Sequence, residues 1–276
     1  MIGKTSKETI SNLDLMEFKE RFEFIRNNKE RILNQKKSEF KEADALAFNL
    51  PEQKVNKIEP LSDSEIEKTE NLDVSVIANL SMYFDSHRDV QGDKCWNQSL
   101  KNTTLVYHTQ DHSRNVGDYV GIPKSIEMES FRTDKLGIKS KVKNAQALVL
   151  KSTVSKKMDE KIHYLYGKGV LKQHSVGMNY VKLFLAVNDK EDEQGYKLYN
   201  KYIDKIINKK EVEKYGYFFY VAESKLIEVS AVTRGSNPIT PTTEVSSSKT
   251  EQSDTQTEQS KSDTLNEQLI FYKHLN

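Results

Sequence analysis

The residue best suited to covalent chemistry is Ser175, which lies in the segment HSVGMNYV at residues 174–181. From Ser175 onward, apolar side chains at every second position predict a strand. Gly177 has no Cβ and would let a substrate carbonyl or another chain approach the backbone closely. A serine in that setting is a candidate nucleophile, although the triplet Ser-Val-Gly alone is a weak motif.

A serine nucleophile needs a base within hydrogen-bonding reach, usually a histidine, and a group that holds the base. The chain has six histidines. His174 is adjacent to Ser175, but neighbouring side chains on a strand point to opposite faces. His108 and His112 lie where a predicted strand runs into a polar turn, a position at which a rigid scaffold can hold a catalytic group. The residues alone leave both as candidate bases.

Zinc binding is a competing interpretation, because His108 and His112 are four residues apart and Asp111 lies beside them. This spacing suits zinc ligands on a helix, whereas the segment TTLVYH at residues 103–108 predicts a strand, and no third ligand stands out. We therefore expect no metal site and keep a zinc-dependent hydrolase as a lesser alternative.

The acid that could orient a histidine is Glu228, in the segment KLIEVSAV at residues 225–232. It lies between Ile227 and Val229 in an otherwise apolar predicted strand, where a carboxylate needs a partner. The alternative is that this strand is amphipathic and that Glu228 simply faces solvent.

Charge and composition exclude several classes of protein. The 276 residues include 42 basic and 41 acidic ones, and this balance argues against a general nucleic-acid binder. The single cysteine, Cys95, allows no intrachain disulfide and fits a reducing compartment. No apolar run approaches the roughly 18 residues of a membrane span, and the first residues lack the apolar region of a signal peptide. We expect a soluble, intracellular protein.

Residues 1–70 are predicted to form a charged helical arm and a linker. From Leu13 to Phe40, apolar residues recur at spacings of three, four and seven, which indicates one amphipathic helix or two. The helix either packs on the main domain or docks onto another chain. Pro51 and Pro60 mark the linker that follows.

Residues 72–240 are predicted to hold the compact domain, in which short strands alternate with helices in an α+β arrangement. Besides the serine strand, we expect strands at 72–84, 103–111 and 215–232 (the last a hairpin or strand pair), a hairpin of 125–131 with 138–142, and helices at 93–100, 145–165 and 191–213. Residues 241–276 form a disordered tail by composition. Its last segment, LNEQLIFYKHLN, either docks back onto the domain or engages a partner.

Several segments occur in an order that is informative as a set. They are DSHRDVQGDKCWNQSL (85–100), VYHTQDHSRNVGDYVG (106–121), DKLGIKSKV (134–142), HSVGMNYV (174–181) and KLIEVSAVTRGSNP (225–238). Together they resemble the prohead (procapsid) maturation protease family of tailed bacteriophages, which is related in fold to the herpesvirus assembly protease. The resemblance covers about residues 72–240 and lies in the order and spacing of the segments.

The resemblance implies a mostly antiparallel, β-barrel-like protease core with flanking helices. Ser175 matches the nucleophile of the family, and the base matches His112 or His108. We prefer His112, because it directly precedes the polar turn as the family histidine does, although this turn is longer than in the family. Glu228 matches a family acid that would be the third catalytic residue.

The resemblance further implies a serine endopeptidase that cleaves the scaffold region of the major capsid protein, and itself, during procapsid maturation. We accordingly expect polypeptide substrates, a homo-oligomer inside the assembling procapsid in the host cytoplasm, and no cofactor, nucleic-acid partner or membrane. The alternative from another class is a non-catalytic scaffold or capsid-associated structural protein with the same fold. A serine sealed in the core would favour that alternative, whereas catalysis requires Ser175 beside an imidazole.

Overall fold

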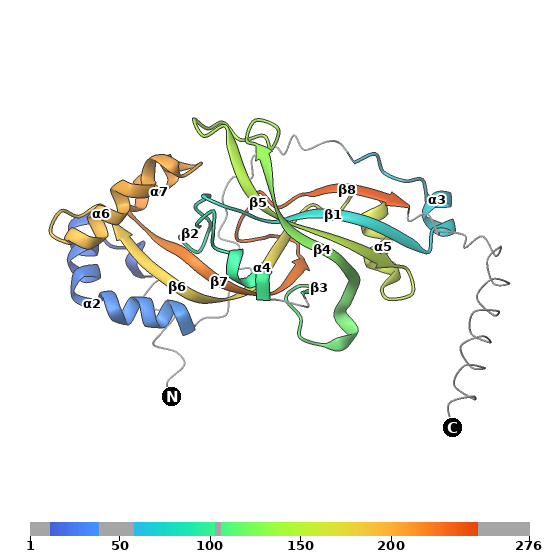
Figure 1. Cartoon of the computed structure of the whole chain (residues 1–276), viewed down its shortest axis with the longest axis horizontal. Coiled ribbons are helices and arrows are strands. Elements are labelled where there is room, and N and C mark those ends of the chain that lie inside the picture. The colour runs from blue at the N-terminus through green and yellow to red at the C-terminus, as the bar shows by residue number, and fades with distance from the viewer. Residues whose placement is uncertain (1–11, 39–57, 103–105, 248–276) are drawn as a thin grey trace, which may run out of the picture.

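The computed structural model describes residues 12–38, 58–102 and 106–247, which form an α+β fold built on one open, mixed sheet (Figure 1). The strands are β1 (Asn71–Leu80), β2 (Asp89–Gln91), β3 (Tyr107–Gln110), β4 (Tyr119–Arg132), β5 (Asn144–Ser155), β6 (His174–Val187), β7 (Tyr217–Ala231) and β8 (Thr242–Ser247). The helices are α2 (Phe18–Ser38), α3 (Asp63–Lys68), α4 (Asn97–Asn102), α5 (Glu160–Gly167), α6 (Glu193–Tyr202) and α7 (Lys209–Tyr215). The predicted α+β class is confirmed.

The expected barrel is wrong, because the sheet is open. The strand order is β2-β7-β3-β4-β5-β1-β8, with β6 paired to β7 off this path, and no pairing among the described strands joins β2 to β8. Closure requires the two end strands to pair. β2 has only three residues, and it pairs in parallel with β7, as β3 does, whereas the other strand pairs are antiparallel.

Strand β4 connects the two halves of the sheet. Its first residues pair with β3, and the residues from Ile122 onward pair with β5. The register shifts between Pro123 and Ser125. Proline has no backbone N–H to donate to a ladder, so a bulge at this point is expected, and a bulge bends the strand. One long strand can therefore pair with strands of both halves of the sheet.

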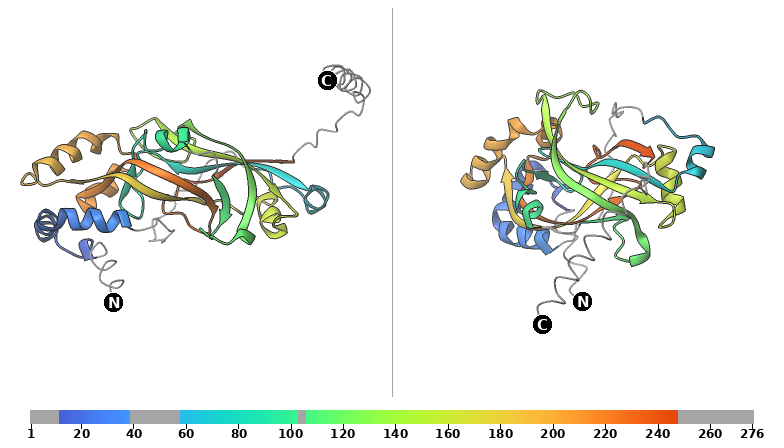
Figure 2. Two further views of the ribbon diagram at one scale, coloured as in Figure 1. Left: turned by 60° about the horizontal axis from the view of Figure 1, so that its bottom comes forward. Right: turned by 45° about the vertical axis from the view of Figure 1, so that its right-hand side comes forward.

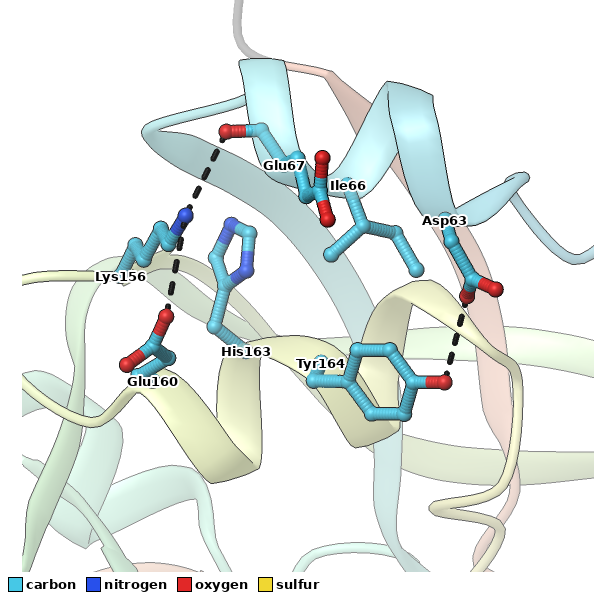
Figure 3. Close-up of a pocket in the computed structure, with 7 residues that line it drawn as sticks. All are labelled: Asp63, Ile66, Glu67, Lys156, Glu160, His163 and Tyr164. Atoms are coloured by element: carbon cyan, nitrogen blue, oxygen red, sulfur yellow. Dashed lines mark hydrogen bonds and ion pairs between the residues drawn. The ribbon is translucent and has the colours of Figure 1, made fainter.

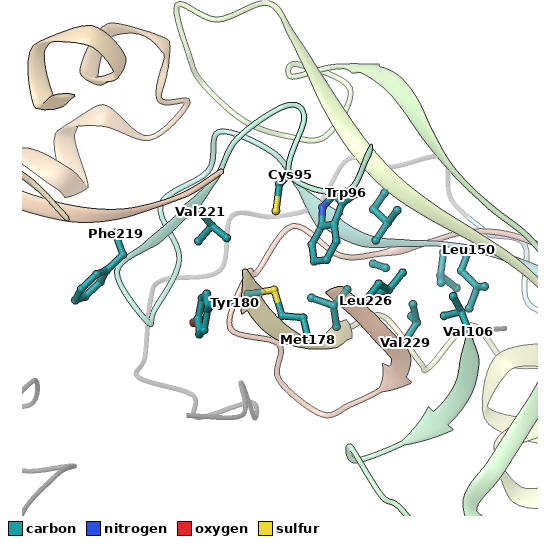
Figure 4. Packing of buried hydrophobic residues seen from close by; sticks show 14 of the residues in the cluster. Cys95, Trp96, Val106, Leu150, Met178, Tyr180, Phe219, Val221, Leu226 and Val229 are labelled. Carbon is teal, nitrogen blue, oxygen red and sulfur yellow. The ribbon is translucent and has the colours of Figure 1, made fainter. Parts of the chain in front are cut away.

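The main hydrophobic core lies where the two halves meet (Figure 4). Strand β5 contributes Leu150, whereas β6 contributes Met178 and β7 contributes Val229. Trp96, which precedes α4, is fully buried in the same cluster. The apolar alternation in β6 thus buries one face of the strand, which leaves Ser175 and Gly177 on the other face.

Helix α2 packs against β6, at the end of the molecule that also carries α6 and α7 (Figures 1 and 2). Ile25 and Ile32 are fully buried. The guanidinium of Arg21 donates hydrogen bonds to the carbonyls of Leu13 and Tyr215, at 2.6 and 2.7 Å. Of the two interpretations of the arm, the packed helix is therefore the one observed. None of the helices in the described ranges is long and apolar enough to span a membrane.

The predicted helix at 145–165 is wrong. Residues 144–155 form β5, which pairs with β4 on one side and β1 on the other, and only Glu160–Gly167 is helical. Ala and Leu favour a helix locally, but burial between two strands decides the outcome. The predicted strand at 138–142 is likewise part of the β4–β5 connection, and the predicted helix at 191–213 is divided into α6 and α7.

The C-terminal boundary also differs from the prediction. Residues 242–247 form β8, which pairs antiparallel with β1, so the segment predicted to be disordered begins with a strand. Residues 217–231 form one continuous strand, β7, instead of a hairpin. The remainder of the tail, 248–276, lies outside the described residues, as do most of the linker at 39–57 and residues 103–105.

A chain of hydrogen bonds crosses the interior, and we call it the buried histidine chain. Ring nitrogens of His108 lie 3.0 Å from Ser152 Oγ and 3.1 Å from Tyr166 Oη. Tyr166 Oη lies 2.9 Å from His174 Nε2, and His174 Nδ1 lies 2.9 Å from the carbonyl oxygen of Thr240. The chain therefore links β5, β3, α5 and β6 to the segment before β8.

The last acceptor fixes every proton in this chain. The Thr240 carbonyl can only accept, so His174 Nδ1 donates, and in the neutral ring Nε2 must accept from Tyr166. Tyr166 then accepts from His108, which leaves the other nitrogen of His108 to accept from Ser152. Burial lowers the pKa of His108 to about 3 and that of His174 to about 4, so both rings are neutral at pH 7.

These neutral histidines predict a loss of stability in mild acid. In the unfolded chain both rings bind a proton below about pH 6.5, whereas in the folded chain they do so only near pH 3 and 4. The unfolded state therefore holds more protons, and the free energy of unfolding falls as the pH is lowered from 6.5 towards 4, by about 1.4 kcal/mol per pH unit for each histidine. Urea unfolding of the wild type and of His174→Gln, at several pH values, measures this slope.

We expect the slope of His174→Gln to be shallower by roughly one proton. Gln can still donate to Thr240 and accept from Tyr166, and the carboxylates contribute equally to both proteins. Identical slopes between pH 6 and 4.5 would contradict the buried neutral state of His174.

Candidate functional site

Three neighbouring strands bring the candidate residues onto one face of the sheet. Strand β6 places Ser175 opposite Ser230 of β7, and Gly177 opposite Glu228. Strand β3 runs on the other side of β7, with Thr109 beside Ser230. Side chains of residues paired across strands point to the same face. We call this surface the site face and define it by Tyr107, Thr109, Ser175, Gly177, Glu228 and Ser230.

Glu228 holds His112 over this face. Nδ1 of His112 lies 2.6 Å from Oε1 of Glu228, and both side chains are nearly buried. A carboxylate only accepts, so Nδ1 carries the proton and donates, and Nε2 is the acceptor nitrogen of the neutral ring. Nε2 is buried and has no hydrogen-bond partner among the described residues. The ring thus has one basic nitrogen unpaired, while a carboxylate orients it through the other.

Two further hydroxyls close a ring of hydrogen bonds around this pair. The backbone N–H of His112 donates to Ser230 Oγ at 2.9 Å, and Ser230 Oγ lies 2.6 Å from Thr109 Oγ1. Thr109 Oγ1 donates to Oε2 of Glu228 at 3.1 Å. Since the proton of Thr109 goes to the carboxylate, Ser230 donates to Thr109. Both carboxylate oxygens of Glu228 and two nitrogens of His112 are therefore fixed.

The backbone at His112 adopts an uncommon conformation. Asp111 and His112 have φ values of 48° and 55°, and the N–H of Ser113 donates to the carbonyl of Gln110 at 2.9 Å. Two consecutive positive φ values closed by such a bond are typical of a type I′ turn, which favours Asn, Asp and Gly. The N–H of Asp111 donates to the carbonyl of Ala231, so β7 also holds this turn. The turn directs the imidazole back towards Glu228.

Gly177 is required where Glu228 lies. A Cβ at position 177 would overlap Oε1 of Glu228 and would lie 2.8 Å from its Cδ. The glycine therefore makes room for the acid and not, as the sequence suggested, for a substrate carbonyl.

Ser175 lies on the same face, one strand away from the residue that binds the His112 backbone. Its side chain makes no hydrogen bond to another described residue, so no bond joins it to either candidate histidine. The residue is 3% exposed. The structure thus brings together His112 and Glu228. It places Ser175 on β6, beside Ser230 of their hydrogen-bond ring, and covers Ser175 almost completely.

His108 cannot act as the base in this arrangement, because both of its ring nitrogens belong to the buried histidine chain. It follows Tyr107 on β3, so its side chain points to the face opposite Tyr107 and Thr109. Strand β3 ends at Gln110, and the turn at Asp111 and His112 then directs His112 into surroundings that differ from those of His108. No group of three metal-ligating side chains converges anywhere in ranges 12–38, 58–102 and 106–247, so the zinc alternative has no support there.

Sequence reasoning missed Thr109 and Ser230. The available signal was the period of two, which places Ser230 on the same face as Glu228, and Thr109 on the face opposite His108. A serine two residues from a buried carboxylate is a ready hydrogen-bond partner, but which strand supplies the next hydroxyl depends on the parallel pairing of β3 with β7.

A hollow of about 290 Å³ lies between α3 and α5 (Figure 3). Its lining residues are Asp63, Ile66, Glu67, Lys156, Glu160, His163 and Tyr164. His163 is fully buried, and neither ring nitrogen has a partner among the described residues. Burial, together with the nearby ammonium of Lys156, lowers the pKa of this ring, so it is neutral at pH 7. The hollow shares no residue with the site face.

The close approach of Gly177 and Glu228 predicts that Gly177→Ala displaces the carboxylate from His112. We expect the free energy of unfolding to fall by about 1–3 kcal/mol, because the added methyl overpacks a buried site. The His112 ring signals should shift in an NMR spectrum, since Nδ1 loses its acceptor. Gly117→Ala is the matched control, because a Cβ at Gly117 meets nothing within 4 Å.

The double variant Gly177→Ala/Glu228→Ala tests the cause. Removing the carboxylate relieves the overlap, so the two changes together should destabilise less than the sum of the single changes. Strict additivity would contradict the proposed contact.

The chain matches no family model, no curated protein and no solved structure. What this site can do therefore has to be inferred from its geometry. An imidazole with one nitrogen on a buried carboxylate, and the other unpaired, is equipped to accept a proton from a hydroxyl. The hydroxyl of Ser175 is the candidate donor on the same face.

Proposed function

We propose that this chain is a serine endopeptidase in which Ser175 is the nucleophile, His112 the base and Glu228 the residue that orients it. The observation that carries the proposal is the state of His112, with Nδ1 donating to Glu228 and Nε2 unpaired in a buried position. A serine, a histidine and an acid in these roles are found together on unrelated folds, because acyl transfer requires the same three functions.

The mechanism follows from the direction of the hydrogen bonds. His112 Nε2 takes the proton of Ser175 as Oγ attacks the carbonyl carbon of a peptide. Glu228 stabilises the imidazolium that forms, and the imidazolium returns the proton to the leaving amine when the C–N bond breaks. Water, deprotonated by the same nitrogen, then attacks the acyl-enzyme, which releases the carboxylic acid and restores Ser175.

An oxyanion formed at the substrate carbonyl needs donors fixed in place. Arg234 and Gly235 are candidates, because a Cβ at Gly235 would approach the carbonyl oxygen of His174, the residue before Ser175. Neither backbone N–H of this pair donates a hydrogen bond to a described residue. Gly177, the other candidate from the sequence, carries Glu228 beside it and is the weaker choice.

The substrates we propose are the scaffold region of the major capsid protein of a tailed bacteriophage and the protease itself. Support comes from the resemblance of the five ordered segments to prohead maturation proteases. We place this activity in a homo-oligomer within the procapsid, in the host cytoplasm, and the fold of the core would be related to that of the herpesvirus assembly protease.

A non-catalytic scaffold or capsid-associated protein is the second candidate. The burial of Ser175 favours it, because a substrate reaches that hydroxyl only if the covering residues move. Ser175 and His112 share no hydrogen bond in this structure. A catalytic role therefore requires that this bond form when substrate binds, as catalytic hydrogen bonds often do.

A fluorophosphonate probe separates the two candidates without a known substrate, since it phosphonylates an activated serine and releases fluoride. We expect labelling of Ser175 in the full chain, located by peptide mass spectrometry. Ser175→Ala should abolish labelling, and His112→Gln should slow it by at least about 10³-fold, the order of effect seen when a triad residue is removed.

Ser224→Ala is the matched control, because Ser224 is another buried serine on the neighbouring strand whose hydroxyl has no partner among the described residues. Co-expression of wild type and Ser175→Ala with the cognate capsid protein, read by intact mass, then identifies the cleavage sites. Absence of labelling together with absence of cleavage would favour the structural candidate, and equal labelling in wild type and Ser175→Ala would rule out this nucleophile.

A further inference from the structure

Two tyrosines extend the site face beyond the His112–Glu228 pair. Tyr107 of β3 and Tyr119 of β4 stack with ring centroids 5.1 Å apart and an interplanar angle of 3°. Tyr107 is 38% exposed, and Tyr119 is half-buried. We call this pair the tyrosine platform.

Strand register fixes where the platform lies relative to the candidate active site. Tyr107 is paired with Glu228 across β3 and β7. Tyr119 is paired with Thr109, whose hydroxyl donates to Glu228. The backbone of Tyr107 is therefore one strand spacing, roughly 5 Å, from that of Glu228, the residue that orients His112. Along β3, Tyr107 lies two residues, roughly 7 Å, from Thr109.

The platform is also the open end of an otherwise buried face. Thr109, Ser175, Glu228 and Ser230 are each at most 5% exposed, whereas Tyr107 keeps more than a third of its surface in contact with solvent. An extended polypeptide that reaches Ser175 from this side would pass the tyrosines, and its alternate side chains, spaced by about 7 Å, would face them.

We propose that the tyrosine platform is the subsite that selects an apolar side chain of the polypeptide substrate, within a few residues of the bond to be cleaved. This inference rests on the proposed endopeptidase function. Two parallel phenol rings present a flat carbon surface, against which an aromatic or long aliphatic side chain removes apolar area from water. A rigid aromatic pair loses little conformational freedom when the substrate binds, which makes it a suitable specificity determinant.

The test compares cleavage-site profiles of the full chain on a library of peptides that a Glu-specific protease releases from a bacterial proteome, read by mass spectrometry of new termini. In the wild type we expect one position near the cleaved bond to be enriched in Leu, Ile, Met, Phe or Tyr. Tyr107→Ala and Tyr119→Ala should each lose that enrichment, with kcat/KM for the best apolar peptide falling by about tenfold or more. Peptides with Ala at this position should be cleaved at nearly unchanged rates.

Two control variants and one labelling measurement guard against a trivial loss of activity. Tyr107→Phe keeps the ring plane and should keep the preference. Tyr202→Ala breaks another stacked tyrosine pair, formed with Tyr220 away from the site face, and should change nothing in the profile. Labelling of Ser175 by the fluorophosphonate, which is too small to need the platform, should persist in Tyr107→Ala and so shows that the variant is folded.

The outcomes distinguish a failure of the platform inference from a failure of the endopeptidase proposal. If Tyr107→Ala and Tyr119→Ala retain the wild-type preference, the platform is not the subsite, and the endopeptidase proposal stands. If the lost preference is for Lys or Arg, the platform binds cations and the inference as stated is wrong. If the wild type cleaves no peptide, or cleaves without dependence on Ser175, the endopeptidase proposal fails and the platform inference fails with it.

Discussion

The arrangement of this protein around its candidate site depends on one buried carboxylate. Glu228 is itself buried and precedes Val229, which enters the core, and a buried charge without partners is strongly unfavourable. The structure supplies two partners, Thr109 on one carboxylate oxygen and His112 on the other. Gly177 follows from the same constraint, because no other residue leaves room for the acid. Residues from two neighbouring strands and from a strained turn thus contact the side chain of Glu228.

The two histidines of one short segment show how the end of a strand separates roles. His108 points into the interior, where burial lowers its pKa to about 3 and two hydroxyls occupy its nitrogens. His112 lies past the strand end, with one nitrogen on a carboxylate and the other unpaired among the described residues. The same imidazole group is therefore structural in His108 and a candidate base in His112, because the surroundings of the two rings differ.

The sequence was sufficient to predict local features of single segments, but it was insufficient to predict which strands pair with one another. The period of two around Ser175 identified β6, and the acid between Ile227 and Val229 indicated a carboxylate in need of a partner. The residues alone could not choose between His108 and His112, because the choice depends on where β3 ends, and only the family resemblance favoured His112. The helix expected at 145–165 failed for the same reason, since burial of β5 between β4 and β1 outweighs the helical preference of its residues. Thr109 joins the site only through parallel pairing with β7.

The turn that carries His112 retains backbone strain. Positive φ values at Asp111 and His112 cost of the order of 1–3 kcal/mol each when the residue has a Cβ, and glycine would remove that cost. A turn that only connected β3 to β4 would gain stability from glycine at both positions. The chain instead keeps a histidine there. Ser230 binds the backbone N–H of His112, and Glu228 binds its ring. Strain that is retained, and offset by bonds that orient one side chain, is compatible with the proposed role of His112 as the base.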